Sequence, residues 1–237
     1  MPAWLFVAVA VAAFASGAPL SGEAHQTAAE VLGVEHAASS RLFATAHLAA
    51  AVALAAAGIS ARKQTPVLST IFGLVGAEVF HFLSAAVRSS ALTLGVGVLA
   101  TAAMLASIRV APRTVGQRAP LREAILGSAT LSLAGVPGAS PLACALASRA
   151  WTASRAPVEA AALVAVPFEL RAAWSAWAST DAAPSRSELA LALAVAFVAA
   201  LLGSRGLRLG AERLVGLAVP WLCVLGASLL AYAWSAR

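Results

Sequence analysis

The chain has 237 residues, of which 61% are hydrophobic and only 11% are charged. A soluble domain carries about 25% charged residues, so this composition excludes a soluble enzyme with a solvated surface. The net charge of +6 comes from bases spread over short polar stretches, which argues against a nucleic-acid partner. We therefore expect an all-α polytopic membrane protein, surrounded by membrane lipids, with one membrane domain over residues 1–237.

Six apolar stretches have about the length that a helix needs to cross the hydrocarbon core of a bilayer. Charged residues and prolines separate them along the chain. These predicted transmembrane helices are Ser39–Ser60, Pro66–Val87, Ala91–Ile108, Pro157–Ser179, Glu188–Ser204 and Leu214–Trp234.

Two further apolar regions are interrupted by glycine and proline. Ala3–Gly33 is broken around Pro19, and Leu121–Trp151 is broken around Pro137. Each region offers two helices of about 12–15 residues, which are too short to cross singly. Such pairs favour two re-entrant helical hairpins. For Met1–Ala18 a secretory signal is the alternative, although no Lys or Arg precedes its apolar run.

The two broken regions indicate an internal repeat. Pro19 and Pro137 are 118 residues apart, and the same shift carries Pro66–Val87 onto the Glu188–Ser204 span. Repeat one then covers about residues 1–118 and repeat two about residues 119–237. Each repeat has one hairpin and three crossings, and an odd number of crossings inverts the second repeat. This predicts an inverted-topology repeat with its site near the midplane of the membrane.

The basic residues predict the orientation. The side that holds both termini keeps four of them, namely Arg41, Arg88, Arg186 and Arg237. The opposite side receives eleven, namely Arg62, Lys63, Arg109, Arg113, Arg118, Arg122, Arg149, Arg155, Arg205, Arg208 and Arg213. Since cytoplasmic loops carry the excess of Lys and Arg, both termini are expected on the outer, periplasmic side of a bacterial inner membrane.

Short motifs follow the two breaks. They are Pro19-Leu20-Ser21-Gly22-Glu23-Ala24-His25 with Leu32-Gly33, His47-Leu48-Ala49-Ala50, Pro137-Gly138-Ala139-Ser140, and the helix Val158–Ala173 with Pro167 inside. They resemble the motifs of the bacterial undecaprenyl-diphosphate phosphatase family, also called bacitracin-resistance protein. The resemblance covers nearly the whole chain. The family's two glutamates fall at Ala12 and Ser16 here, and its arginine, second serine and glycine fall at Pro141, Leu142 and Ala143.

The resemblance implies an enzyme that dephosphorylates undecaprenyl diphosphate to undecaprenyl phosphate. Its partner would be a polyprenyl diphosphate lipid, and its product would return the lipid carrier to cell-wall synthesis. Bacitracin resistance would follow. A divalent ion, Mg²⁺ or Ca²⁺, is the cofactor that the family implies, and its ligands in this chain are unknown.

Hydrolysis of a diphosphate needs stabilised phosphate oxygens, a nucleophile or positioned water, and a proton donor. His25 is the expected acid, base or nucleophile. Ser21 and Ser140 stand beside helix starts, where they can bind phosphate oxygens or attack phosphorus. Glu23 can replace a lost carboxylate. The structural alternative makes Ser21 a helix N-cap and Glu23 a first-turn residue that complements the helix dipole.

We expect substrate binding by residues of the motif that begins at Pro137 and by two residues inside spans. Pro137 and Gly138 belong to the motif Pro137-Gly138-Ala139-Ser140, and His47 belongs to the motif His47-Leu48-Ala49-Ala50. Arg171 can supply the cation that is lost at Pro141. A charge at the depth of Arg171 needs a partner. A structural ion pair of Arg171 with Glu78 or Glu169 is therefore the alternative.

Two other functions remain open. Loss of the family's arginine and glutamates would suit a non-catalytic polyprenyl-phosphate flippase or binding protein, because inverted repeats with paired hairpins are also a transporter architecture. A small structural subunit of an envelope complex is the third possibility. The assembly is left open, with a homodimer as one candidate.

Overall fold

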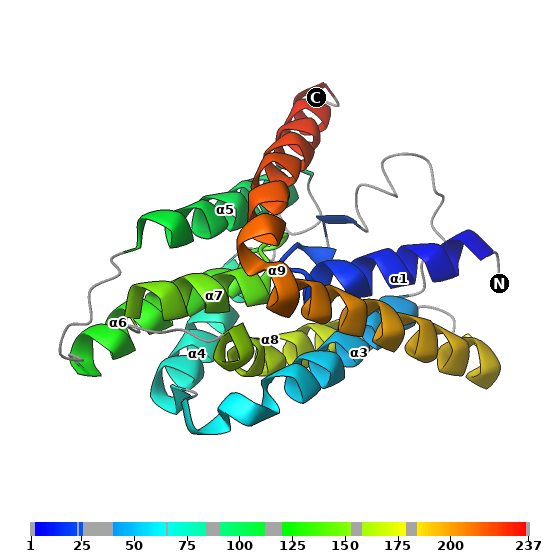
Figure 1. Ribbon diagram of the computed structural model, residues 1–237. Helices are drawn as coiled ribbons and strands as arrows, with labels where there is room; N and C mark the ends of the chain where they lie inside the picture. The colour runs from blue at the N-terminus through cyan, green and yellow to red at the C-terminus, as the bar shows by residue number, and fades with distance from the viewer. Residues whose placement is uncertain are drawn as a thin grey trace.

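The computed structural model describes residues 3–22, 24–25, 40–64, 66–83, 91–111, 120–152, 158–178 and 184–235. Within these ranges every element is helical (Figure 1). The α-helices are α1 (Ala3–Gly17), α3 (Ser40–Gly58), α4 (Val67–Leu83), α5 (Ala91–Val110), α6 (Pro120–Ser132), α7 (Pro141–Thr152), α8 (Val158–Trp177) and α9 (Arg186–Ser235). Two short 3₁₀ helices are η1 (Ile59–Gln64) and η3 (Leu133–Gly135).

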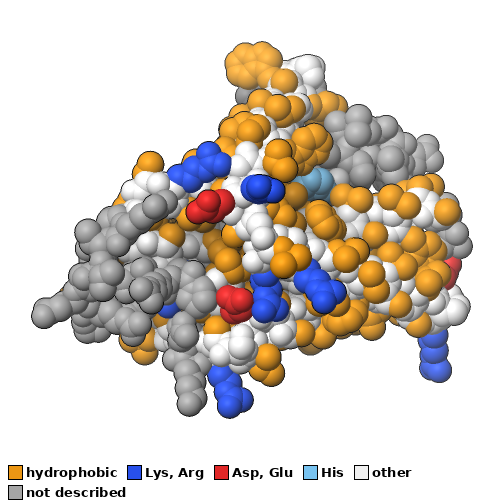
Figure 2. Space-filling model, in the orientation of Figure 1, with side chains coloured by type: hydrophobic (Ala, Val, Ile, Leu, Met, Phe, Trp, Pro, Cys, Tyr) orange, Lys and Arg blue, Asp and Glu red, His pale blue; other side chains and the backbone are white. Residues whose placement is uncertain are grey.

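Three of the described helices are long and apolar enough to cross a membrane, namely Arg41–Arg62, Ala91–Val110 and Arg186–Ser235. Large apolar side chains also lie on the outside, as on α4, where Phe82 is 79% exposed. Figure 2 shows hydrophobic side chains over most of the described part of one face, with few charged ones. An all-helical chain with such a surface is consistent with a helical membrane protein, as the composition predicts.

The second interrupted region forms two short helices, as expected from its length. The helix α6 has 13 residues and continues into η3, whereas α7 has 12 residues. The chain between them leaves helical geometry at Val136, which is extended, and Gly138 adopts a positive φ of 82°. Pro141 then starts α7, because its missing N–H costs nothing in the first turn. In the first interrupted region α1 ends at Gly17, and residues 26–39 lie outside the described part.

The last two predicted spans are joined in the structure. The predicted spans Glu188–Ser204 and Leu214–Trp234 lie in two helical segments of α9 that meet, without a loop, at a kink at Gly210, where φ is −156° and ψ is 46°. The connecting segment consists mainly of Leu, Arg, Ala and Glu, which are good helix formers, and it contains no proline. Figure 1 shows the two halves of α9 pointing in different directions.

The two halves of α9 pack against different partners. The N-terminal half lies beside α1 and α3, where Val9, Leu42 and Ala196 share one buried cluster. The C-terminal half lies beside α5, where Val98 and Leu222 share a second cluster (Figure 1). The third cluster joins α3, α4, α6, α7, α8 and, through Leu207, α9. The extensive contact between α3 and α8 brings a polar pair together in the interior.

Two helix crossings depend on glycine in the same way. A Cβ at Gly17, at the end of α1, would collide with the carbonyl oxygen of Ala200 in α9. A Cβ at Gly135, at the end of η3, would collide with the carbonyl oxygen of Ala77 in α4. Both glycines therefore allow a close backbone approach, which is the usual role of small residues between membrane helices. Gly17 and Gly135 are 118 residues apart, which equals the spacing of Pro19 and Pro137.

Candidate functional site

His47 and Glu169 form a buried polar pair between α3 and α8. The Nδ1 atom of His47 lies 2.8 Å from Oε2 of Glu169, and the Glu169 side chain has no exposed surface. The carboxylate accepts, so Nδ1–H of His47 donates, and the other ring nitrogen, Nε2, is then the acceptor of a neutral imidazole. Within the described part of the chain, Oε1 of Glu169 has no hydrogen-bond partner. A buried carboxyl that is only half satisfied is costly and is a frequent feature of functional sites.

Ser21 follows α1 after a tight turn, which the hydrogen bond from the Leu20 N–H to the Ala15 carbonyl closes. The Ser21 side chain is 2% exposed, and its Oγ accepts the N–H of Ala24 at 3.2 Å. This contact caps a helical turn, as the structural alternative for Ser21 predicted. A serine oxygen that accepts in this way still has its own proton to donate.

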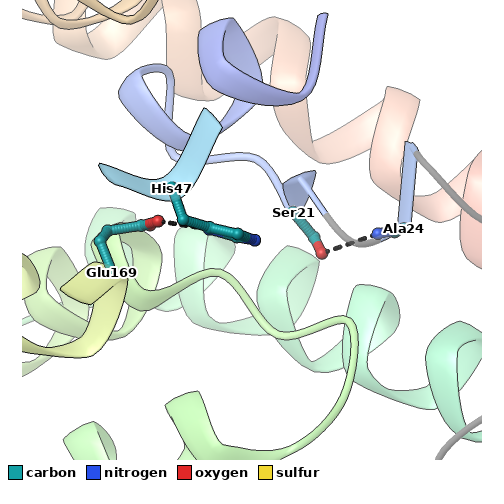
Figure 3. A network of polar contacts seen from close by, with 4 residues as sticks. All are labelled: Ser21, Ala24, His47 and Glu169. Carbon is teal, nitrogen blue, oxygen red and sulfur yellow. Dashed lines mark hydrogen bonds and ion pairs between the residues drawn. The ribbon is translucent and has the colours of Figure 1, made fainter. Parts of the chain in front are cut away.

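Figure 3 shows two polar contacts close to each other, one between His47 and Glu169 and one between Ser21 and Ala24. The ring of His47 lies between the side chains of Glu169 and Ser21, with Nδ1 at Glu169 and the far ring nitrogen pointing toward the hydroxyl of Ser21. The three residues come from the turn after α1, from α3 and from α8. Proton transfer from the hydroxyl to the imidazole requires a hydrogen bond between them, and the contacts of the described residues join His47 to Glu169 and Ser21 to Ala24.

His25 is held in a different direction. Its Nδ1–H donates to the carbonyl oxygen of Ser21 at 2.7 Å, and its Nε2 accepts the indole N–H of Trp221 at 3.1 Å. The two rings are also stacked, with centroids 6.2 Å apart. His25 lies between α1 and α3, outside the three spanning helices, and burial lowers its pKa from the usual 6.5 while the Ser21 carbonyl opposes this shift. Both ring nitrogens thus face groups other than the Ser21 hydroxyl.

Ser140 is completely buried at the start of α7. Its Oγ accepts the N–H of Ala143 at 3.3 Å, and its own N–H donates to Oγ1 of Thr101 in α5 at 2.9 Å. Ser140 is therefore an N-cap that also ties α7 to α5. Ala24 and Ala143 belong to the same buried cluster, so the two interrupted regions meet in one part of the core.

Pro137 and Gly138 pack against α5. Both are buried, and a Cβ at Gly97 would collide with the Pro137 carbonyl oxygen. A Cβ at Gly138 would meet the carbonyl oxygen of Leu94. These contacts explain the two residues by packing, and their part in substrate binding stays a prediction.

Arg171 pairs with Glu78, as the structural alternative for it predicted. Nε and Nη2 of Arg171 donate to the two carboxylate oxygens of Glu78, and the Nη2–Oε2 distance is 3.1 Å. Residues two apart on a helix point to different sides, so Arg171 faces α4 while Glu169 faces His47. A role of Arg171 in phosphate binding stays a prediction.

The remaining predicted groups lie outside the described part of the chain or are not tested by it. Glu23 lies outside the described residues. Among the described residues, no three His, Cys, Asp or Glu side chains gather into a group that could hold a metal ion. The pair of His47 and Glu169 by itself offers two side chains that can bind a metal ion, which is fewer than three. The Mg²⁺ or Ca²⁺ that the family resemblance implies stays a prediction, and no step below depends on it.

Two hollows in the surface lie near these helices. A groove of about 490 Å³ runs along α3 and α8 and is almost entirely apolar; it is lined by Ala44, Thr45, Leu48, Leu170, Ala173, Trp174 and Trp177. A second hollow of about 620 Å³ lies among α5, α7, α8 and α9. It contains Arg109, Glu212 and Arg213 among apolar side chains.

The pairing of His47 with Glu169 was missed by the sequence analysis. His47 was assigned to substrate binding, and Glu169 was only a candidate partner for Arg171. The available signal was the position of Glu169 near the middle of an apolar span, where a carboxylate needs a partner. The comparison with known protein families finds no model that matches the chain, and the curated proteins contain no match either.

Proposed function

We propose that the protein is an integral-membrane phosphatase that converts undecaprenyl diphosphate to undecaprenyl phosphate. The observation that carries this proposal is the buried pair of His47 and Glu169, with Ser21 close to it, inside an all-helical protein of membrane type. Ser21 is a candidate nucleophile and His47 a candidate proton acceptor, and such side chains suit the cleavage of a phosphoanhydride bond. The motif resemblance around Ser21 and His47 names the substrate class.

The apolar groove supports a substrate with a long hydrocarbon chain. It runs along α3 and α8, the two helices that hold His47 and Glu169. A polyprenyl chain in the groove would place its diphosphate end near the level of the pair of His47 and Glu169. Cleavage there would recycle the lipid carrier for cell-wall synthesis and confer bacitracin resistance.

The proposal includes the inverted repeat and its orientation. The equivalent close approaches at Gly17 and Gly135, and the meeting of Ala24 and Ala143 in one cluster, support two related halves whose interrupted regions face each other. Together with the distribution of Arg and Lys, this favours a bacterial inner membrane with both termini on the periplasmic side. Cysteine accessibility at engineered terminal residues, probed from each side of the membrane, tests the orientation.

The function is tested with the full chain in detergent micelles. Undecaprenyl diphosphate or farnesyl diphosphate is supplied with Mg²⁺, with Ca²⁺ or with a chelator, and phosphate release is measured. We expect release that Ser21→Ala abolishes while the variant keeps its elution profile. An absence of release under all three conditions would refute the phosphatase.

The runner-up is a non-catalytic flippase or binding protein for polyprenyl phosphate. The hollow with Arg109 and Arg213 favours it, because two guanidinium groups can hold a lipid phosphate and Glu212 offsets only one of them. Saturable binding of undecaprenyl phosphate without any phosphate release, weakened by Arg109→Ala, would support this function instead.

A further inference from the structure

We infer that the hollow among α5, α7, α8 and α9 binds the headgroup of a singly charged anionic phospholipid, with Arg109 and Arg213 as the ligands of its phosphate. The volume of this hollow is about 620 Å³. The inference goes beyond the proposed function and does not rest on it, because such a phospholipid carries no diphosphate to be cleaved. It also concerns a different place from the apolar groove along α3 and α8.

The two arginines meet at one end of a helix pair. A Cβ at Gly95, near the start of α5, would lie 3.0 Å from the carbonyl oxygen of Gly226 in the C-terminal half of α9. At the other end of α5, Nη2 of Arg109 would lie 2.9 Å from a Cβ at Gly216. The two helices are therefore antiparallel. Since Gly216 follows Arg213 by three residues, both cations lie on the same face of α9.

This end of the pair is expected at the level of the lipid headgroups. The helix α5 is long and apolar enough to cross a membrane, and Arg109 is in its last turn. Most of the other lining side chains are apolar, such as Leu146 of α7 and Leu207 of α9. A basic pocket between membrane helices is a typical site for an acidic headgroup, above all on the cytoplasmic side. The distribution of Arg and Lys predicts that side for both arginines.

Both guanidinium groups have donors to offer to a ligand. Arg109 and Arg213 take part in none of the ion pairs between residues that the structure describes. Both side chains are exposed in the chain taken by itself. A guanidinium binds a phosphate through two parallel N–H···O bonds, so two of them in one hollow can hold a single phosphate from two sides.

The charge of the hollow selects the kind of phosphate. Arg109 and Arg213 contribute +2 and Glu212 contributes −1, which leaves a net charge of +1. The phosphodiester of phosphatidylglycerol has a single negative charge that balances it, and the glycerol hydroxyls can donate to Glu212. A phosphomonoester such as undecaprenyl phosphate has a charge of about −1.5 to −2, and its excess charge would face the Glu212 carboxylate. The hollow therefore favours the diester, which distinguishes this inference from the runner-up function.

The test uses the full chain, freed of lipid, in micelles of an uncharged detergent. Phosphatidylglycerol, phosphatidylethanolamine and phosphatidylcholine are titrated separately, and bound lipid is counted by native mass spectrometry. We expect one phosphatidylglycerol to bind saturably, at least about tenfold more tightly than either zwitterionic lipid. Arg109→Gln and Arg213→Gln should each weaken this binding about tenfold. Arg205→Gln is the matched control, because it removes the same charge from α9 at a residue that does not line the hollow. It should bind like the unmodified protein.

Glu212→Gln tests the selection by charge. At about pH 8 an equal concentration of undecaprenyl phosphate should leave phosphatidylglycerol bound to the unmodified protein but should displace much of it from this variant. The unfolding temperature without lipid checks that each variant is folded.

Three results would overturn the inference. Binding of a zwitterionic lipid as tightly as phosphatidylglycerol would remove the role of charge. Equal weakening in Arg205→Gln would show a general attraction to a basic surface. Ready displacement of phosphatidylglycerol from the unmodified protein by undecaprenyl phosphate would favour the runner-up function instead. Phosphatidylglycerol binding as expected without any release of phosphate from a lipid diphosphate would support the inference and count against the phosphatase alone.

Discussion

The imidazole of His47 donates to the carboxylate of Glu169 over 2.8 Å, although the two residues are 122 positions apart. The pair joins α3 to α8 at the most extensive contact between any two helices that the structure describes. It therefore has a structural role as well as the proposed chemical one. Removal of either partner leaves a buried polar group without this contact, so stability and phosphate release must be measured together on each variant.

The ion pair of Arg171 and Glu78 is expected to be structural. Arg171→Ala should lower the free energy of unfolding by about 1 kcal/mol, since the pair is partly exposed. The charge-swapped double variant Arg171→Glu with Glu78→Arg should recover most of this loss and keep phosphate release. Unfolding in mixed micelles and the release assay check both expectations.

The swap also decides between the two roles of Arg171. A folded double variant with no phosphate release would show that the guanidinium binds the substrate. That outcome would favour the role expected from the lost arginine at Pro141.

Gly138 should not tolerate a side chain. Its φ of 82° is disfavoured for any other residue, and a Cβ would meet the carbonyl oxygen of Leu94. We expect Gly138→Ala to cost about 2 kcal/mol or more of unfolding free energy. Gly206→Ala is the control, because that glycine lies inside α9 and a Cβ there meets only the end of the flexible Leu214 side chain. Equal stability of the two variants would contradict the positive φ.

Ser140 should act through its cap and not through chemistry. Ser140→Ala should cost about 1 kcal/mol, whereas Ser140→Gly should cost only a few tenths, because glycine is an acceptable N-cap. Thr101→Val should cost about 1–3 kcal/mol, because it leaves the buried N–H of Ser140 without its acceptor. Thermal unfolding in detergent ranks the three variants.

Phosphate release from the folded fraction completes the test of Ser140. We expect it to stay close to normal in all three variants. A loss of release in Ser140→Gly at normal stability would instead assign the hydroxyl to the reaction.

Acid should weaken the contact between His25 and Trp221. Burial of the ring lowers the pKa of His25 below the usual 6.5 although the Ser21 carbonyl opposes this shift, and the neutral ring accepts the indole N–H of Trp221 at Nε2. As the pH falls below about 6.5, the unfolded chain therefore binds more protons than the folded chain. The stability that comes from the neutral His25 is complete above about pH 6.5 and is lost as the pH falls through the lower pKa of the folded protein. We expect the unfolding temperature to decrease from about pH 7.5 to about pH 5.5, and less so in His25→Gln.

A matched variant separates the pH effect from the loss of packing. Trp221→Phe keeps an aromatic ring beside His25 but removes the donor, so it should be less stable at neutral pH and should retain a titrating histidine. An identical pH dependence in His25→Gln and the unmodified protein would assign the effect to other groups.

The composition and the spacing of apolar stretches were enough to predict an all-helical protein of membrane type. Runs of about 20 apolar residues are typical of transmembrane helices, because a helix forms all of its backbone hydrogen bonds internally and can therefore lie in lipid. The short helices on either side of Pro137 could also be located, because proline and positive-φ glycine act locally. The direct junction of the two segments of α9 at Gly210 could not be located, because charged residues end an apolar stretch without ending a helix.

The sequence by itself determined which residues are candidates for chemistry: a serine after a proline break, histidines, and a carboxylate in an apolar span. Only the tertiary structure decided which of them meet. His25 bonds the carbonyl of Ser21 and Ser140 caps the turn to Ala143, whereas the packing of α3 on α8 paired His47 with Glu169. The physical reason is range: caps and turns act over three or four residues, but a buried charge selects its partner through the fold of the whole chain.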